Sequence, residues 1–144
     1  MSDIPEGFDS SGFAAYSDHC GPILYKREQL EDGSFRGWAG VLLQEHHIGG
    51  NNRGHGGLLM TLLDEALGMN ACISRNMQPA VTVSMNTQFY APMAAGSFLQ
   101  AYGKVTRSTR SMAFMAGEAW CGDVLVGSAT GVWKYLAVKP QSEQ

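Results

Sequence analysis

The chain of 144 residues is poor in the features that mark secreted, membrane and metal-binding proteins. Its three cysteines, Cys20, Cys72 and Cys121, form neither an even set nor a CxxC pair, so we expect buried free thiols rather than a disulfide framework or a metal site. No apolar run approaches the roughly 18 residues of a membrane span, and the first residues lack a basic and apolar leader. These absences predict a cytoplasmic protein.

Charge limits the partners in the same way. Ten Lys and Arg residues against 13 Asp and Glu residues give a formal net charge of −3, and the basic residues form no dense run. Nucleic acid and membrane surfaces are therefore not expected as partners. At this length one hydrophobic core is expected. We predict an N-terminal lead-in over 1–20, one domain over 21–138 and a C-terminal tail over 139–144.

Apolar periodicity and turn signals predict one long helix between two groups of strands. Residues 55–75 contain good helix formers and no proline, and their apolar positions surround most of the helix, which predicts a central helix covered nearly all round. Residues 81–89 alternate with period two, with Val81, Val83 and Met85 on one side. The remaining strands are expected at 23–25, 35–43, 97–106, 111–121 and 124–137. This order predicts an α+β fold in which a curved antiparallel sheet wraps around the helix.

The first candidate for chemistry is the start of this helix, His55-Gly56-Gly57. Backbone N–H groups at a helix start have no partner within the helix, and the helix dipole adds positive charge there. Such a terminus can bind a carbonyl oxygen that becomes an oxyanion during acyl transfer. Taken alone, a Gly-Gly pair is better explained by plain helix-start packing, so the motif needs support from elsewhere.

The second candidate is Asp64, a carboxylate in the third turn of a mostly apolar helix. Glu65 beside it is the better candidate for an ordinary solvated or paired residue. Gly56 and Asp64 are eight residues apart, about 12 Å along one helix, which is too far for both to act on one carbonyl. We therefore predict a homodimer that shares its active sites, with Asp64 and Gly56 of one site coming from different subunits.

Other chemical motifs are weaker or missing. His46, His47 and His55 do not have the spacing of a zinc site, so no metal is expected. The chain contains no G-x-S-x-G, G-x-G-x-x-G or Walker motif, which disfavours a serine hydrolase of that type and hydride or phosphoryl transfer.

A basic group surrounds the expected connection between two strands. Lys104, Arg107 and Arg110 could contact the phosphates of a nucleotide-bearing thioester, although the residues alone favour a solvated turn.

The order of these motifs resembles the hot-dog-fold acyl-CoA thioesterases, with the phenylacetate-degradation branch as the most similar type. The resemblance rests on residues 55–64, then Val-Thr-Val-Ser-Met-Asn at 81–86, then Tyr-Ala-Pro at 90–92 before Gly96. It covers about residues 21–138. It implies a hot-dog fold, the arrangement already read from the periodicity.

The resemblance also implies residue roles. Asp64 takes the place of the catalytic carboxylate, as nucleophile or as general base on a water, and Thr82 that of a hydroxyl residue that positions the water. Gly56 would supply the oxyanion N–H from the opposite subunit. Family members carry an Asn six residues before the His, where this chain has Gly49, and Asn51 in a shorter loop is the expected replacement.

The stretch 109–114 resembles the part of the family that lies along the pantetheine and phosphates of CoA. The substrate-binding residues expected on this basis are His55, Gly57, Arg107, Arg110, Met112 and Ala113. No metal or redox cofactor is expected, because CoA enters as part of the substrate.

We therefore expect an acyl-CoA thioesterase, as a homodimer whose pairing into a tetramer is the further expectation. Two alternatives stay open at this point. An acyl-thioester dehydratase or hydratase would need a His/acid pair, for which His55 is the nearest candidate. A non-catalytic acyl-CoA sensor would bind the thioester without cleaving it. The acyl group is open among aromatic, short-chain and medium-chain types.

Overall fold

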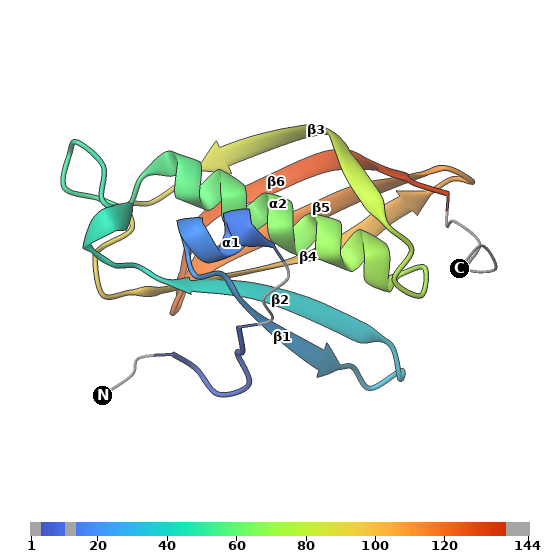
Figure 1. The fold of residues 1–144 in the computed structure, drawn as a ribbon, viewed down its shortest axis with the longest axis horizontal. Helices are drawn as coiled ribbons and strands as arrows, with labels where there is room; N and C mark the ends of the chain where they lie inside the picture. Colours follow the sequence, from blue (N-terminus) through green and yellow to red (C-terminus); the bar gives the residue numbers. More distant parts are fainter. Residues whose placement is uncertain (1–3, 11–13, 138–144) are drawn as a thin grey trace.

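A computed structural model describes residues 4–10 and 14–137 of the chain, drawn in Figure 1. The tail predicted at 139–144 lies outside the described residues. The elements, in chain order, are α1 (Ala15–Cys20), β1 (Leu24–Gln29), β2 (Phe35–Leu42), the 3-10 turn η1 (Glu45–His47), α2 (Gly56–Ile73), β3 (Ala80–Phe89), β4 (Phe98–Ser108), β5 (Met112–Cys121) and β6 (Val124–Tyr135).

The six strands form one antiparallel sheet in the order β1-β2-β4-β5-β6-β3. The long helix α2 lies across one face of this sheet, and the sheet curves around it (Figure 1). Strands β1 and β3 form the two edges of the sheet. The α+β fold, with a curved antiparallel sheet around one central helix, is confirmed.

Two glycines let α2 approach the middle of the sheet closely. Gly103 of β4 lies directly opposite Gly117 of β5, and the Leu67 side chain of α2 packs on this pair. A Cβ atom at Gly103 would lie 3.1 Å from Leu67 Cα, so a larger residue there would push the helix away. The contact closes a core in which Leu62, Leu63 and Leu67 are all fully buried.

A bulge in β3 interrupts the predicted alternation of its side chains. The register of β3 on β6 shifts between Thr82 and Ser84, so Val83 is an extra residue. Thr82 lies on the helix side before the bulge, where it contacts α2, and Met85 packs against the core after it. The prediction that Val81, Val83 and Met85 share one face was wrong, because one inserted residue reverses a period of two.

The prediction that α2 is covered nearly all round was also wrong for a single chain. One side of the helix packs on the sheet, whereas Met60 on another side is 43% exposed. Asp64, Glu65 and Met69 are half-buried. No helix among the described residues is long and apolar enough to cross a membrane.

Helix α1, at the end of the predicted lead-in, is attached to α2 and to the turn before it. In α1, Ser17 is buried and its hydroxyl donates to Glu65 Oε1 at 3.1 Å. The hydroxyls of Tyr16 and Thr61 lie 3.3 Å apart, and the Cys20 carbonyl bonds to the buried His47 ring at 2.7 Å. Helix α1 therefore covers part of the side of α2 that the sheet leaves open.

We expect Gly117→Ala to destabilise the protein by about 1–3 kcal/mol, because the new Cβ would clash with Leu67 and with the Tyr102 carbonyl. Urea unfolding followed by circular dichroism measures this change. Gly50→Ala is the matched control, since a Cβ there meets nothing within 4 Å, and it should change the free energy of unfolding by less than about 0.5 kcal/mol. Equal stability of Gly117→Ala and wild type would contradict the close approach.

Candidate active site

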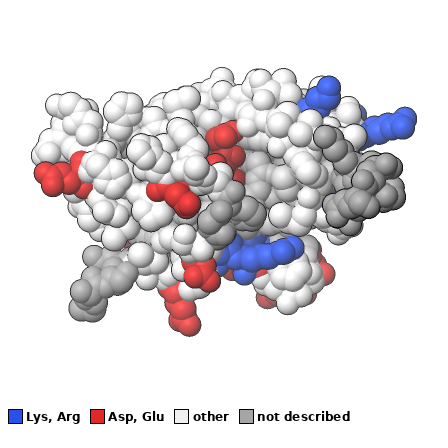
Figure 2. Space-filling model, viewed as in Figure 1, with Lys and Arg blue, Asp and Glu red and all other residues white. Residues whose placement is uncertain are grey.

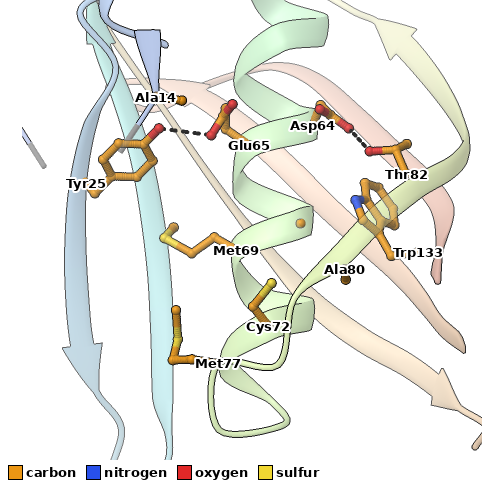
Figure 3. A pocket seen from close by; sticks show the side chains of 11 residues that line it. Ala14, Tyr25, Asp64, Glu65, Met69, Cys72, Met77, Ala80, Thr82 and Trp133 are labelled. Atoms are coloured by element: carbon orange, nitrogen blue, oxygen red, sulfur yellow. Dashed lines mark hydrogen bonds between the residues drawn. The ribbon is translucent and has the colours of Figure 1, made fainter. Parts of the chain in front are cut away.

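The centre of the candidate site is a hydrogen bond between α2 and β3. Thr82 Oγ1 donates to Asp64 Oδ1 at 2.6 Å, as Figure 3 shows. This bond holds the carboxylate in one orientation, and Asp64 Oδ2 has no hydrogen-bond partner among the described residues. One carboxylate oxygen is therefore held while the other is available to a ligand or a water.

Asp64 and Thr82 lie at the edge of a hollow of about 360 Å³ on the side of α2 that the sheet leaves open (Figure 3). Most of its wall is apolar and rich in sulfur, with Trp133 on one side. Burial raises the pKa of the Cys72 thiol, which disfavours a thiolate nucleophile at neutral pH. The lining residues are Ala14, Tyr25, Asp64, Glu65, Gly68, Met69, Cys72, Met77, Ala80, Thr82 and Trp133.

Glu65 is tied down by partners from distant segments. Its Oε2 accepts from the Tyr25 hydroxyl at 2.9 Å and its Oε1 accepts from the Ser17 hydroxyl. Burial raises the pKa of Tyr25 to about 12, and the negative charge of Glu65 adds to this effect. Glu65 is thus a paired structural residue, one of the two ordinary roles expected for it from the sequence. Nothing in the sequence indicates that Tyr25 and Ser17 are its partners.

The start of α2 has the geometry of a helix cap with one free donor. His55 is the N-cap, and its Nδ1 accepts the N–H of Gly57 at 2.8 Å. The next donor used is the Leu58 N–H, which bonds to the His55 carbonyl. The N–H of Gly56 has no acceptor among the described residues. Of the two glycines, Gly56 is therefore the one whose N–H can bind a ligand oxygen.

Gly56 and Asp64 do not meet within one chain. They are two helical turns apart on α2, about 12 Å along the axis. Each lies beside a different end of β3, since a Cβ at Gly56 would be 3.2 Å from the Phe89 ring whereas Asp64 contacts Thr82. The single chain therefore presents the carboxylate and the free N–H at separate places.

Asn51 is exposed in the turn before α2. The turn is closed by a bond from the Gly49 N–H to the Arg53 carbonyl at 2.7 Å and by a bridge between Ile48 and Gly54. The Asn51 side chain forms no hydrogen bond with the described residues. The turn therefore places Asn51 at the end of the molecule where α2 begins, away from Asp64 of the same chain.

The four histidines of the chain gather at one place. His19, His46, His47 and His55 line a second hollow beside the start of α2. No group of three or more His, Cys, Asp or Glu residues in the described part of the chain has the geometry to hold a metal ion. Burial lowers the pKa of His47, whose Nδ1 accepts from the Gln44 N–H and whose Nε2 bonds to Cys20, so this ring is a structural part of the turn.

The other predicted substrate-binding residues lie around the β4–β5 turn. Arg107 and Arg110 are exposed there, and their side chains form no hydrogen bond, ion pair or ring contact with the described residues. Met112 is half-buried at the start of β5. Ala113 is completely buried in the core, so the structure does not confirm it as a substrate-binding residue: no part of it is exposed to a ligand in the single chain.

Comparison with known proteins identifies the family of the chain. Residues 51–128 match the family described as the Thioesterase superfamily. A relative from Pseudomonas aeruginosa, named "Putative esterase PA0474", is 31% identical over 135 residues, which cover 92% of this chain and 98% of the relative.

Two solved structures share the fold. A Bacillus halodurans protein crystallised with CoA is 24% identical, with a TM-score of 0.73, over 89% of this chain and 83% of that one. A mutant of the phenylacetic acid degradation protein PaaI from Thermus thermophilus is 23% identical, with a TM-score of 0.71, over 85% of this chain and 100% of that one. The chain belongs to the thioesterase superfamily, and its fold is the predicted hot-dog fold.

The Tyr25–Glu65 pair predicts a pH dependence of stability. The pKa of Tyr25 is about 12 in the folded protein and about 10 in an unfolded chain. Between these values the unfolded chain loses a proton that the folded protein keeps, so the free energy of unfolding should fall as the pH rises through this window. In Tyr25→Phe the free energy should fall less between about pH 9 and about pH 11.

Urea unfolding at the two pH values measures this difference. Tyr16→Phe is the control, because Tyr16 is 61% exposed, and it should follow the wild type. An equal fall in Tyr25→Phe and wild type would show that the Tyr25 hydroxyl does not titrate differently on folding.

Proposed function

We propose that the protein is an acyl-CoA thioesterase in which Asp64 drives the attack on the thioester carbonyl. The observation that carries the proposal is the Thr82–Asp64 bond of 2.6 Å, which orients a carboxylate beside an apolar hollow. Asp64 acts as the nucleophile or as the general base that takes a proton from a water. The water oxygen ends on the acyl carbon, the C–S bond breaks, and CoA leaves as the thiol.

Gly56 would stabilise the charge that develops on the carbonyl oxygen. Its N–H has no acceptor among the residues that the structure describes, and it lies at the N-terminal end of an 18-residue helix, where the helix dipole favours negative charge. His55 supports this role by accepting the neighbouring Gly57 N–H, which holds the first turn in place. Asn51, in the turn just before, is our candidate for a second donor to the same oxygen.

The two halves of the site would meet in a homodimer joined through β3. This strand is an edge with unpaired backbone groups, and three of its apolar side chains are exposed: Val81 at 45%, Val83 at 56% and Phe89 at 53%. An exposed apolar edge strand is a surface that pairs with another strand. A second copy of β3, related by a twofold axis, would pair with it antiparallel and extend the sheet.

The register of this pairing follows from the positions of the two groups. Asp64 lies beside Thr82 and Gly56 lies beside Phe89, near opposite ends of β3. If the twofold axis passes near the middle of the strand, at Met85, Thr82 of one subunit comes opposite the Phe89 end of the other. Asp64 then faces Gly56 of the partner subunit, and the dimer has two such sites.

CoA is the proposed carrier of the acyl group. The similar Bacillus halodurans protein was crystallised with CoA. The exposed Arg107 and Arg110 suit the phosphates of that group, and the half-buried Met112 and Gly57 would lie along its arm. The proposal uses no metal and no redox cofactor.

The dehydratase alternative is disfavoured by the state of His55. Its Nδ1 already accepts the Gly57 N–H, so in the neutral ring the proton is on Nε2. Neither nitrogen can then take a proton from a substrate carbon without breaking the helix cap. A thioesterase needs no such base, since Asp64 supplies the proton acceptor.

Asp64→Asn should lower kcat by at least about a hundredfold, because the amide can neither take a proton nor attack the carbonyl. Thr82→Ala should cost about tenfold, the size of one hydrogen bond to a charged group. Both are measured by thiol release from a panel of aromatic and straight-chain acyl-CoAs. The panel also ranks the acyl groups.

Asp123→Asn is the matched control, since it makes the same chemical change in the exposed β5–β6 turn, and it should keep wild-type turnover. Wild-type turnover in folded Asp64→Asn would refute the role of Asp64. Tight CoA binding with no release from any acyl-CoA would favour the sensor.

A heterodimer tests the sharing of the site between subunits. Gly56→Pro removes the free N–H at the first helical position, where proline is well tolerated. Two differently tagged chains, one with Asp64→Asn and one with Gly56→Pro, form a heterodimer with one site free of both changes. It should have about half the wild-type turnover, although each parent is nearly inactive.

The matched control joins a wild-type chain to a chain that carries both substitutions. Each site of that heterodimer contains one damaged group, so it should be nearly inactive. The opposite order of activities would show that Asp64 and Gly56 act within one chain, and a monomer in light scattering would exclude the shared site.

A further inference from the structure

Arg75, just beyond the end of α2, holds the turn between β4 and β5. Its guanidinium donates to Ser108 Oγ and to the Arg110 carbonyl, each at 2.7 Å, and also to the Thr109 carbonyl. The guanidinium carbon, Cζ, lies 4.0 Å from the centre of the Tyr135 ring. Three segments far apart in the sequence are thus joined by one side chain.

The aromatic partner of Arg75 is itself fixed to α2. The Tyr135 hydroxyl donates to the Ala71 carbonyl at 2.8 Å and lies 3.1 Å from Ser74 Oγ. The β4–β5 turn is therefore tied, through Arg75 and Tyr135, to the helix that carries Asp64. A planar guanidinium with several donors suits this task, whereas a lysine ammonium does not.

The turn that Arg75 holds carries two further arginines. The side chains of Arg107 and Arg110 form no hydrogen bond, ion pair or ring contact with the described residues. Arg75 adds a third positive charge, because all of its hydrogen-bond acceptors are neutral. In Figure 2, basic side chains project at the end of the molecule where α2 and the β4–β5 turn lie (Figure 1). In a chain with a net charge of −3, this is a local concentration of positive charge.

The turn lies at the same level of the sheet as the candidate site. Thr82 of β3 pairs with Trp133 of β6, which pairs with Ala113 at the start of β5. Two strand spacings separate Thr82 from Ala113, about 10 Å. An acyl-CoA whose thioester lies at Asp64 can therefore reach the β4–β5 turn with its extended arm.

We propose that Arg75 is a positioning residue that holds the β4–β5 turn so that Arg107 and Arg110 bind the phosphates of CoA. The inference rests on the proposed function, because it takes CoA as the carrier of the substrate. Arg75 acts through the turn and does not touch the reacting atoms. Loss of its hydrogen bonds should weaken binding of the phosphate-bearing part and leave the hydrolytic step intact.

The test compares one acyl group on two carriers, CoA and N-acetylcysteamine, which lacks the nucleotide and its phosphates. In Arg75→Met, KM for the acyl-CoA should rise about tenfold with little change in kcat. This is the size expected when displaced Arg107 and Arg110 lose charge-assisted hydrogen bonds to the phosphates. The kcat/KM for the N-acetylcysteamine thioester should change less than about twofold. Arg75→Lys should resemble Arg75→Met, because it keeps the charge but loses the planar set of donors.

Arg27→Met is the matched control. Arg27 also lies over an aromatic ring, that of Phe35 at 4.5 Å, and is exposed on β1. Its loss removes the same charge, and KM for the acyl-CoA should stay at the wild-type value. Thermal unfolding of each variant shows whether it is folded.

A double-mutant cycle separates positioning from direct binding. If Arg75 acts through the turn, adding Arg75→Met to the Arg107→Met/Arg110→Met protein should not raise KM further. An additive rise, a full rescue by Arg75→Lys, or equal losses on both carriers would each overturn the proposal.

Failure of the proposed function gives a different result. If the wild type hydrolyses neither thioester, the thioesterase proposal fails, and calorimetry with free CoA and with pantetheine still tests Arg75. Wild type should then bind CoA more tightly than pantetheine, and Arg75→Met should lose about tenfold for CoA alone. Equal affinity of the wild type for both molecules would overturn the role of Arg75.

Discussion

The structure depends on the close approach of α2 to the centre of the sheet. Gly103 and Gly117 face each other on neighbouring strands and leave room for Leu67, so the sheet can curve around the helix. Because one side of α2 is buried against the sheet, Asp64 and Glu65 lie on the other side of the helix, where they line the hollow. The same contact that forms the core therefore determines where the carboxylates lie.

A rigid helix places the two candidate groups at a distance that one chain cannot close. The free N–H of Gly56 and the carboxylate of Asp64 are two turns apart, and β3 runs beside both. This geometry explains why an exposed edge strand would be kept on a protein of this size. In our proposal the edge is the means by which a second helix brings its N-terminus to Asp64.

Much of the fold could be predicted from local patterns. The long helix, the six strands and the curved antiparallel sheet follow from periodicity and turn residues, which act over short distances. The face of β3 was predicted wrongly, since the bulge at Val83 reverses the alternation without a signal in the sequence. The exposure of Met60 was not predicted, because an apolar sequence does not show whether the residues that cover a helix belong to the same chain.

The candidate site divides along the same line. The motif at the start of α2, the position of Asp64 and the spacing between them could be derived from residue order, because the geometry of an α-helix is constant. The Thr82–Asp64 bond, the Glu65 pairing with Tyr25 and Ser17, and the Arg75 contacts with the β4–β5 turn join residues 18 to 48 positions apart. Such pairs arise only when the packed sheet and helix bring distant segments together, so no local rule could predict them.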